Sequence, residues 1–164
     1  MTSLKSMLLE PFLTFLRDDK PTPAQALPQL RLVFVFGFVV QLGVAGLVGF
    51  MMRLLAGAPS GDATLMAQVL LGLSLLQGVP VALLASPTAH DGGKQAALSA
   101  TIATAVLFAA PGWFVAFAWL VGVPALYLLA LVAVLMVYYA LGLLLVGRYA
   151  GWLEPSPHDN TTSS

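Results

Sequence analysis

The stretch that decides the fold is KQAALSATIATAVLFAAPGWFVAFAWLVGVPALYLLALVAVLMVYYALGLLLVGR, from Lys94 to Arg148, with 53 uncharged residues between its two end cations. An ionised side chain at the centre of a bilayer costs roughly 2.5–3.5 kcal/mol on insertion scales, so long uncharged stretches are candidate membrane spans. A helix of about 20 residues crosses the hydrocarbon core. The stretch is therefore long enough for two spans, and Gly122, Val123 and Pro124 supply a turn between them.

Two further uncharged stretches lie on the N-terminal side of this one. There are 21 residues between Arg31 and Arg53, and 27 between Asp62 and His90. The chain of 164 residues is 59% apolar and only 9% charged, whereas soluble domains are about 25% charged. We therefore predict an all-α integral membrane bundle at residues 30–150, with four helices at about 30–55, 65–86, 95–121 and 124–148.

The third predicted helix contains Pro111 and Gly112, and a proline removes a backbone hydrogen bond and bends a helix. We expect a single kinked span. In the alternative, the helix ends near Ala110 and the segment from Trp113 to Leu120 lies along the membrane interface, where tryptophan is favoured.

The distribution of basic residues predicts the orientation, because retained loops carry lysine and arginine on the cytoplasmic side. If both termini lie on one side of the membrane, that side holds six of the seven basic residues and the other side holds only Arg53. We predict a multi-pass cell-membrane protein with both termini in the cytoplasm. The six residues are Lys5, Arg17, Lys20, Arg31, Lys94 and Arg148.

Residues 1–29 are predicted to form a short cytoplasmic amphipathic helix and a linker. Apolar residues recur at helical spacing, and Pro11 limits the ordered part to about 9–17. The helix would lie on the cytoplasmic leaflet, pack against the inner end of the bundle, or dock to another subunit. The proline-rich residues 18–28 are predicted to form an extended linker. Residues 151–164 are predicted to form a disordered cytoplasmic tail. The apolar stripe comprises Leu4, Met7, Leu8, Phe12, Phe15 and Leu16.

Small residues predict which helices pack together, because helices associate in lipid through close backbone approach. The candidate packing residues are Gly43, Gly46 and Gly49 in the first helix and Ser74, Gly78 and Ala82 in the second. The third helix has a similar row of small residues. The fourth is dominated by leucine and valine and is expected to face lipid most, so we expect a core of the first three helices with the fourth at the periphery or at a contact with another protein. The residues that cover much of its surface are Leu128, Leu131, Val132 and Leu135.

Two glutamines form the candidate polar contact inside the membrane. Gln41 lies ~15 Å above Arg31 and Gln77 ~14 Å from Ser86, so they are level if the helices are antiparallel. A hydrogen bond between them would position the first two helices. Alternatively the pair lines a small polar cavity, aided by a kink at Pro80.

The composition excludes several functional classes. The net charge is zero, which argues against nucleic-acid binding, and the absence of cysteine removes disulfides and thiolate chemistry. The spans contain no carboxylate and no histidine, so no catalytic, cofactor-binding or metal-binding residue is predicted, and we do not expect an enzyme. We predict a non-catalytic accessory or structural subunit that contacts the bilayer and a membrane protein partner or a second copy. The alternative is a small permease or channel component using Gln41 and Gln77.

Overall fold

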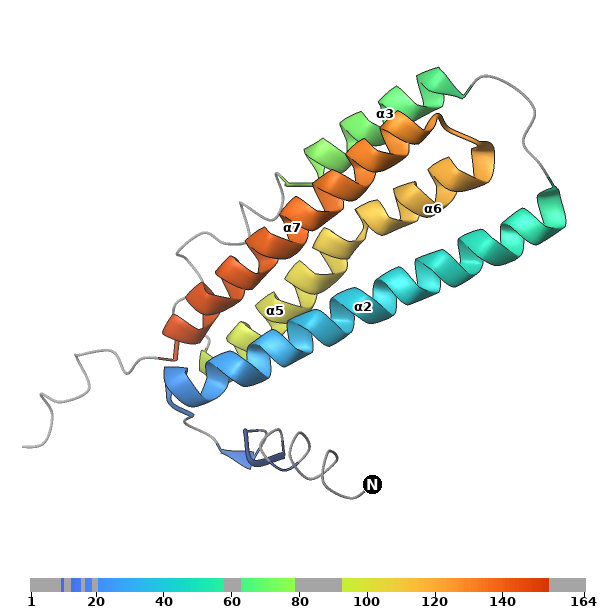
Figure 1. Ribbon diagram of the computed structural model, residues 1–164. Helices are drawn as coiled ribbons and strands as arrows, with labels where there is room; N and C mark the ends of the chain where they lie inside the picture. The colour runs from blue at the N-terminus through green and yellow to red at the C-terminus, as the bar shows by residue number, and fades with distance from the viewer. Residues whose placement is uncertain are drawn as a thin grey trace, which may run out of the picture.

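A computed structural model of the chain describes residues 10, 13–15, 17–18, 21–57, 63–78 and 93–153, and the regular elements in these ranges are helices (Figure 1). Three described stretches, Pro23–Ala56, Gly93–Val121 and Ala125–Gly151, are long and apolar enough to cross a membrane, whereas the described part of the second predicted span is a shorter apolar helix. The helices are α2 (Pro23–Ala56), α3 (Thr64–Leu76), α5 (Gly93–Ala109), α6 (Pro111–Val121) and α7 (Ala125–Gly151).

Helix α2 begins seven residues before the predicted start at residue 30, inside the segment predicted to be an extended linker. Pro23 is the first helical residue, where a missing N–H group has no intrahelical partner to lose. The Gln25 side-chain oxygen accepts hydrogen bonds from the backbone N–H and the hydroxyl group of Thr22, at 3.2 and 3.0 Å. Pro28 lies within the helix. The linker prediction was wrong for residues 23–28 because these prolines lie near a well-capped N-terminus.

Helices α5 and α6 form the kinked span that we expected at Pro111. They are separated only by Ala110, whose carbonyl accepts a hydrogen bond from the Trp113 N–H group at 3.0 Å. Helix α6 packs along α2 and α7, with Ala118 fully buried, which does not agree with the alternative of a surface segment. Gly122 then adopts a left-handed conformation with φ of 76°, so the chain turns tightly into α7.

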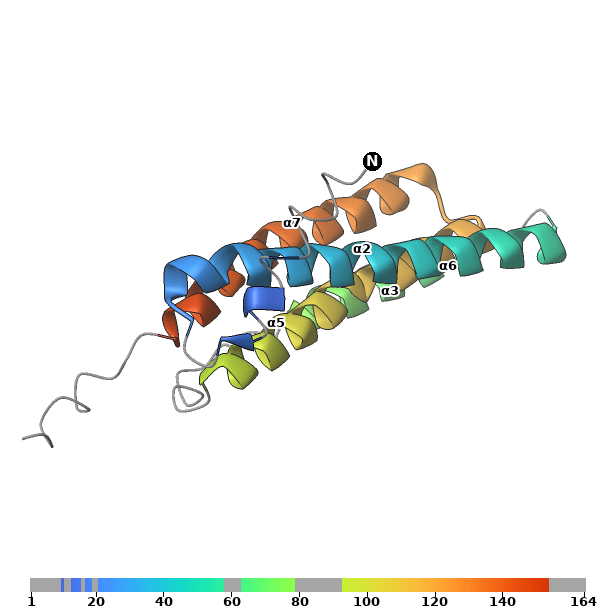
Figure 2. The same cartoon turned by 90° about the horizontal axis from the view of Figure 1, so that it is seen from below.

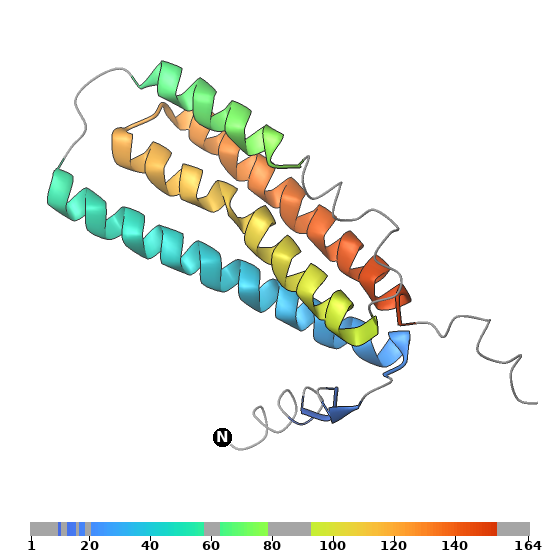
Figure 3. The same ribbon diagram turned by 180° about the vertical axis from the view of Figure 1, so that it is seen from behind.

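The order of packing differs from the prediction. Helix α7 contacts each of α2, α3, α5 and α6, whereas the described part of α3 packs on α7 and α6 and not on α2. Figures 1 and 3 show α2 and α3 on opposite sides of the bundle, and in Figure 2, seen from below, α3 lies largely hidden behind α2 and α6. Leu131 and Leu135, which we expected on a lipid-facing surface, are buried. The predicted core of the first three helices was therefore wrong, because α3 packs on α7 rather than on α2. Helix α7 nevertheless exposes much of its surface: 22% of its most apolar stretch is buried, compared with 39% for Gly93–Val121.

The core has two parts, one at each end of the bundle. Near the start of α2 and the end of α7 it is aromatic: the ring centroids of Phe38 and Tyr139 are 5.1 Å apart, and those of Phe108 and Tyr138 are 5.0 Å apart. Aliphatic and small side chains of α3, α6 and α7 form the other part. The end of the bundle where α2 begins therefore has the larger core, rich in aromatic side chains, and the opposite end has a smaller core.

Several predicted segments lie outside the described residues: most of residues 1–20, the end of the second span with Ala82, and the tail from 154. Of the predicted N-terminal apolar stripe, only Phe15 is described. Its side chain is 5% exposed and lies 5.1 Å from the Lys94 ammonium group at the start of α5. The Lys94 ammonium group also donates to the carbonyl oxygen of Asp18 at 2.9 Å. These contacts place Phe15 against the end of the bundle.

Candidate functional site

The two glutamines of the predicted polar contact lie on helices that do not pack together. Gln41 is half-buried on α2, and Gln77 follows the last residue of α3. No hydrogen bond joins them in the described structure. The side-chain oxygen of Gln77 is buried and has no hydrogen-bond partner among the residues that the structure describes. The sequence predicts a similar depth in the membrane for both residues. Whether two residues at the same depth are in contact depends on which helices are neighbours in the bundle.

The Tyr138 side chain of α7 donates a hydrogen bond to the carbonyl groups at the end of α3. The sequence did not predict this contact. The Tyr138 hydroxyl oxygen lies 2.6 Å from the carbonyl oxygen of Ser74 and 3.1 Å from that of Leu75. Carbonyl groups in the last turn of a helix lack intrahelical donors, so the hydroxyl group supplies a missing donor. A Cβ atom at Gly78 would stand 3.0 Å from the Tyr138 hydroxyl oxygen. The glycine therefore permits the close approach of the two helices.

The buried hydroxyl groups of α3 and α5 donate to carbonyl groups one turn earlier in their own helices. The distances are 2.9 Å for Ser74 to Leu70, 2.8 Å for Thr101 to Ala97 and 2.7 Å for Thr104 to Ala100. Since the Thr104 hydroxyl donates to the backbone, the Tyr149 hydroxyl 2.9 Å away donates to Thr104. These groups are satisfied within the chain and act as structural contacts.

The predicted small residues fall into two groups in the structure. Gly49 lies against α6, where an added Cβ atom would be 3.0 Å from the Ala116 Cβ. Ser74 is buried, and Gly78 faces Tyr138. By contrast, Gly43 and Gly46 are exposed, and an added Cβ atom at either position would meet no other atom within 4 Å. Neither of these two glycines is used in packing within the described chain.

Gly43 belongs to an exposed apolar row along α2, which we call the α2 seam. Its residues are spaced alternately by three and four positions, as in helices that pack lengthwise against one another. The side chains of this row are about half or more exposed. The α2 seam consists of Val40, Gly43, Leu47, Phe50 and Leu54.

A second surface feature of α2 is an apolar groove shared with α6. The groove has a volume of about 250 Å³ and opens at the surface of the bundle. Three glycines are among its lining residues, Gly46 and Gly49 of α2 and Gly112 of α6. Further lining residues are Leu42, Val115, Ala116, Trp119 and Leu135.

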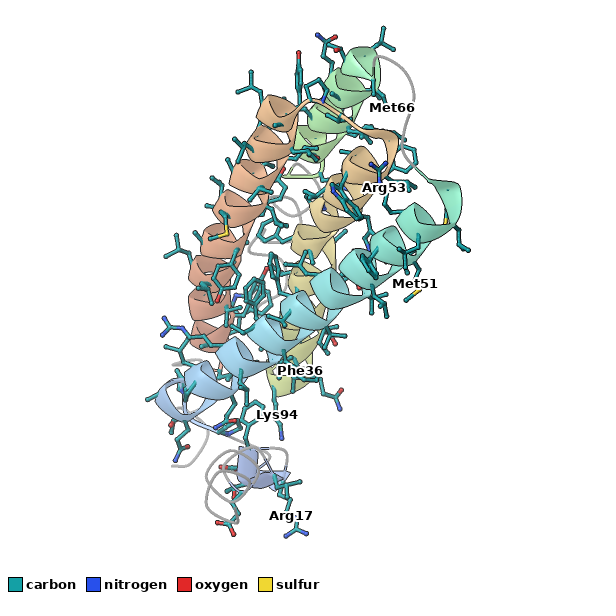
Figure 4. All side chains as sticks on the ribbon, turned by 45° about the vertical axis from the view of Figure 1, so that its right-hand side comes forward. Arg17, Phe36, Met51, Arg53, Met66 and Lys94 are labelled. Carbon is teal, nitrogen blue, oxygen red and sulfur yellow. The ribbon has the colours of Figure 1, made fainter. Side chains whose placement is uncertain are left out.

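Arg53 lies one helical turn beyond the groove residue Gly49. Figure 4 shows its side chain between the ends of α2 and α6. Its Nη1 atom donates to the carbonyl oxygen of Leu120 at 3.0 Å, and its guanidinium carbon lies 5.7 Å from the Trp119 ring centroid. The residue therefore holds the ends of α2 and α6 together and places a positive charge at the mouth of the groove. No described carboxylate pairs with it.

No group of three or more metal-ligating side chains is found among the described residues. In comparisons with known proteins, no family model, curated protein or solved structure matches the chain. The two surfaces of α2 and the polar contacts between α3 and α7 are therefore the candidate sites of the described chain.

Proposed function

We propose that this chain is a non-catalytic accessory or structural subunit of a membrane assembly, and that the α2 seam binds a transmembrane helix of another protein. The observation that carries the proposal is the exposed Gly43 within the seam. Glycine in a helix costs about 1 kcal/mol relative to alanine. Its benefit in lipid is the close approach of another backbone, and the described chain places none there.

The geometry of the α2 seam supports the same proposal. Val40 and Leu54 are 14 residues apart, which corresponds to about 21 Å of helix. Alternating spacings of three and four keep the row on one side of a helix over that length, as a lengthwise helix contact requires. The hydroxyl groups inside the bundle, in contrast, are bonded to the chain's own carbonyl groups. The outer surface is therefore the better candidate for function than the interior.

A second candidate function is a small permease or channel component. It is supported by the Gln77 side-chain oxygen, which is buried and has no partner within the described part of the chain. The next residue, Gly78, faces the hydroxyl group of Tyr138, halfway along α7. Gln41 does not contribute to this region. Saturable flux of a solute into vesicles containing only the purified chain would favour this candidate over the accessory role.

We also propose that the chain lies in the cell membrane with both termini in the cytoplasm. The described chain is compatible with this, since α2 begins and α7 ends at the same end of the bundle (Figure 1). Single cysteines can be placed freely because the natural chain has none. In intact cells an impermeant maleimide should label Asp62→Cys and not Thr88→Cys. The opposite labelling pattern would reverse the proposed orientation.

The partner proposal is tested by photo-crosslinking from the α2 seam. A photoreactive amino acid at Leu47 should capture one membrane protein in the native membrane, whereas the same group at Leu144, an exposed site on α7, should not. In the Leu47 background, Gly43→Leu should reduce the captured product at least tenfold because the larger side chain keeps the partner backbone away. Gly72→Leu, a matched change at an exposed glycine of α3, should leave the yield unchanged.

Two results would contradict the accessory role. Equal capture from Leu47 and Leu144 would mean that the seam contacts lipid and passing proteins without preference. A cross-linked product that contains only this chain would replace the accessory role with self-association. Circular dichroism of each purified variant should show unchanged helix content, because side chains at Gly43 and Gly72 enter open space.

A further inference from the structure

We infer that the groove between α2 and α6 binds an acyl chain of one phospholipid molecule, and that Arg53 binds the phosphate of the same molecule. The site goes beyond the proposed function, because it lies on a different side of α2 from the seam. At 100° per residue, Gly46 is about 80° around the helix from the seam's centre line. The lipid would come from the leaflet at the end of the bundle where α2 ends.

The distance from Arg53 to the far end of the groove corresponds to one leaflet, and the groove itself covers the part of α2 from Leu42 to Gly49, about 10 Å of helix. Leu42 and Arg53 are 11 residues apart, which is about 16 Å along the helix. Half of a hydrocarbon core of ~30 Å is about 15 Å. An extended chain that begins at Arg53 therefore reaches the level of Leu42 at the middle of the membrane.

The volume of the groove favours an acyl chain over a helix. A helix with side chains is at least about 10 Å across. The groove has about 250 Å³, and its lining consists of glycine backbone and apolar side chains. A narrow, flexible hydrocarbon chain fits such a space, whereas a helix could insert only single side chains.

Arg53 supplies charge complementarity at the mouth of the groove. A guanidinium group has five N–H donors in a planar arrangement suited to phosphate, and one donor of Arg53 is used by the Leu120 carbonyl. The nearby Trp119 ring is of a type enriched at the membrane interface, where phosphate groups lie. A phospholipid satisfies both halves of the site, because its acyl chain matches the apolar lining and its phosphate matches the cation.

The test measures phospholipid binding to the purified, delipidated chain by native mass spectrometry. The probes are dioleoylphosphatidylglycerol and dioleoylglycerol, which have the same acyl chains but differ in the phosphate-containing headgroup. The wild-type chain should bind one phosphatidylglycerol molecule and bind diacylglycerol at least tenfold more weakly. Arg53→Gln should reduce phosphatidylglycerol affinity about tenfold and leave diacylglycerol affinity unchanged. Arg31→Gln, at the other end of α2, is the matched charge control.

The groove itself is tested by filling it. Gly46→Leu should reduce binding of both lipids at least tenfold, and Gly46→Ala should reduce it less, because an added side chain occupies the open space. Gly72→Leu is the matched control. If Gly46→Leu does not fold, the graded alanine variant and the two arginine variants still decide the result.

The proposal fails if lipid affinity in Gly46→Leu or Arg53→Gln equals that of the control variants, or if the two lipids bind equally well to the wild-type chain. Lipid binding is measured on the isolated chain, whereas partner capture is measured from Leu47 in the native membrane. Failure of the lipid site is therefore distinguishable from failure of the accessory role.

Discussion

Replacing Gly142 by leucine is expected to lower the free energy of unfolding by about 3 kcal/mol, the upper part of the range for overpacked cores. Gly142 is buried on α7 where α2 and α5 meet it. An added Cβ atom would collide with the Phe34 ring and stand 3.1 Å from the Phe108 ring. Phe34 is fully buried, so its ring has little space into which it can move. The three helices would have to separate.

Thermal unfolding in detergent, followed by circular dichroism, measures this effect. Gly147→Leu is the matched control, since it lies on the same helix and an added Cβ atom there meets nothing within 4 Å. The Gly142 variant should unfold well below the wild-type temperature, and the Gly147 variant close to it. Equal unfolding temperatures for the two variants would mean that α7 does not approach Phe34 closely.

Replacing Phe34 by alanine should lower the free energy of unfolding by about 3 kcal/mol, as large-to-small changes in buried aromatic sites do. The Phe34 ring lies 5.7 Å from the Phe38 ring and 5.9 Å from the Tyr139 ring, and it joins α2 to α7. Its loss leaves a cavity and removes these contacts. In the same unfolding assay, Phe36→Ala should leave the unfolding temperature almost unchanged, since Phe36 is 70% exposed.

The two positions should also be coupled, because they are in direct contact. Gly142→Ala alone should be destabilising, since the Cβ atom meets the Phe34 ring. In the Phe34→Ala background the same change should be neutral or stabilising, because the methyl group enters the new cavity. Additive effects of the two changes would show that they act independently and would contradict the observed contact.

The positions of most helices could be predicted because the signals are local. Uncharged stretches located the first, third and fourth predicted helices, and Pro111 and Gly122 marked the kink and the turn. The start of α2 was missed because Pro23 and Pro28 were read as breaking a helix. A proline at a helix start is tolerated, and only the cap formed by Thr22 and Gln25 shows where that start lies.

The arrangement of the helices could not be predicted from the same signals. A small or polar residue indicates that a helix can be approached closely, but it does not identify the neighbour. Gly43 and Gly46 were grouped with Gly49, yet only Gly49 meets another helix of the described chain. Gly142 was not predicted as a packing residue, because the sequence around it in α7 is rich in leucine. Among the described glycines, Gly142 and Gly112 are the two at which an added Cβ atom would come closest to another side chain.

By itself, the sequence determined an all-helical chain with helices of membrane-spanning length, because charge, hydropathy and proline act within a few residues. Only the tertiary structure decided that α7 packs against α3, that Gln41 and Gln77 lie on helices that do not pack together, and that Arg53 lies beside a groove. These features depend on how side chains of distant segments fit together. In an apolar chain nearly every helix face is chemically alike, so shape selects the neighbours, as the Phe34 ring against Gly142 illustrates.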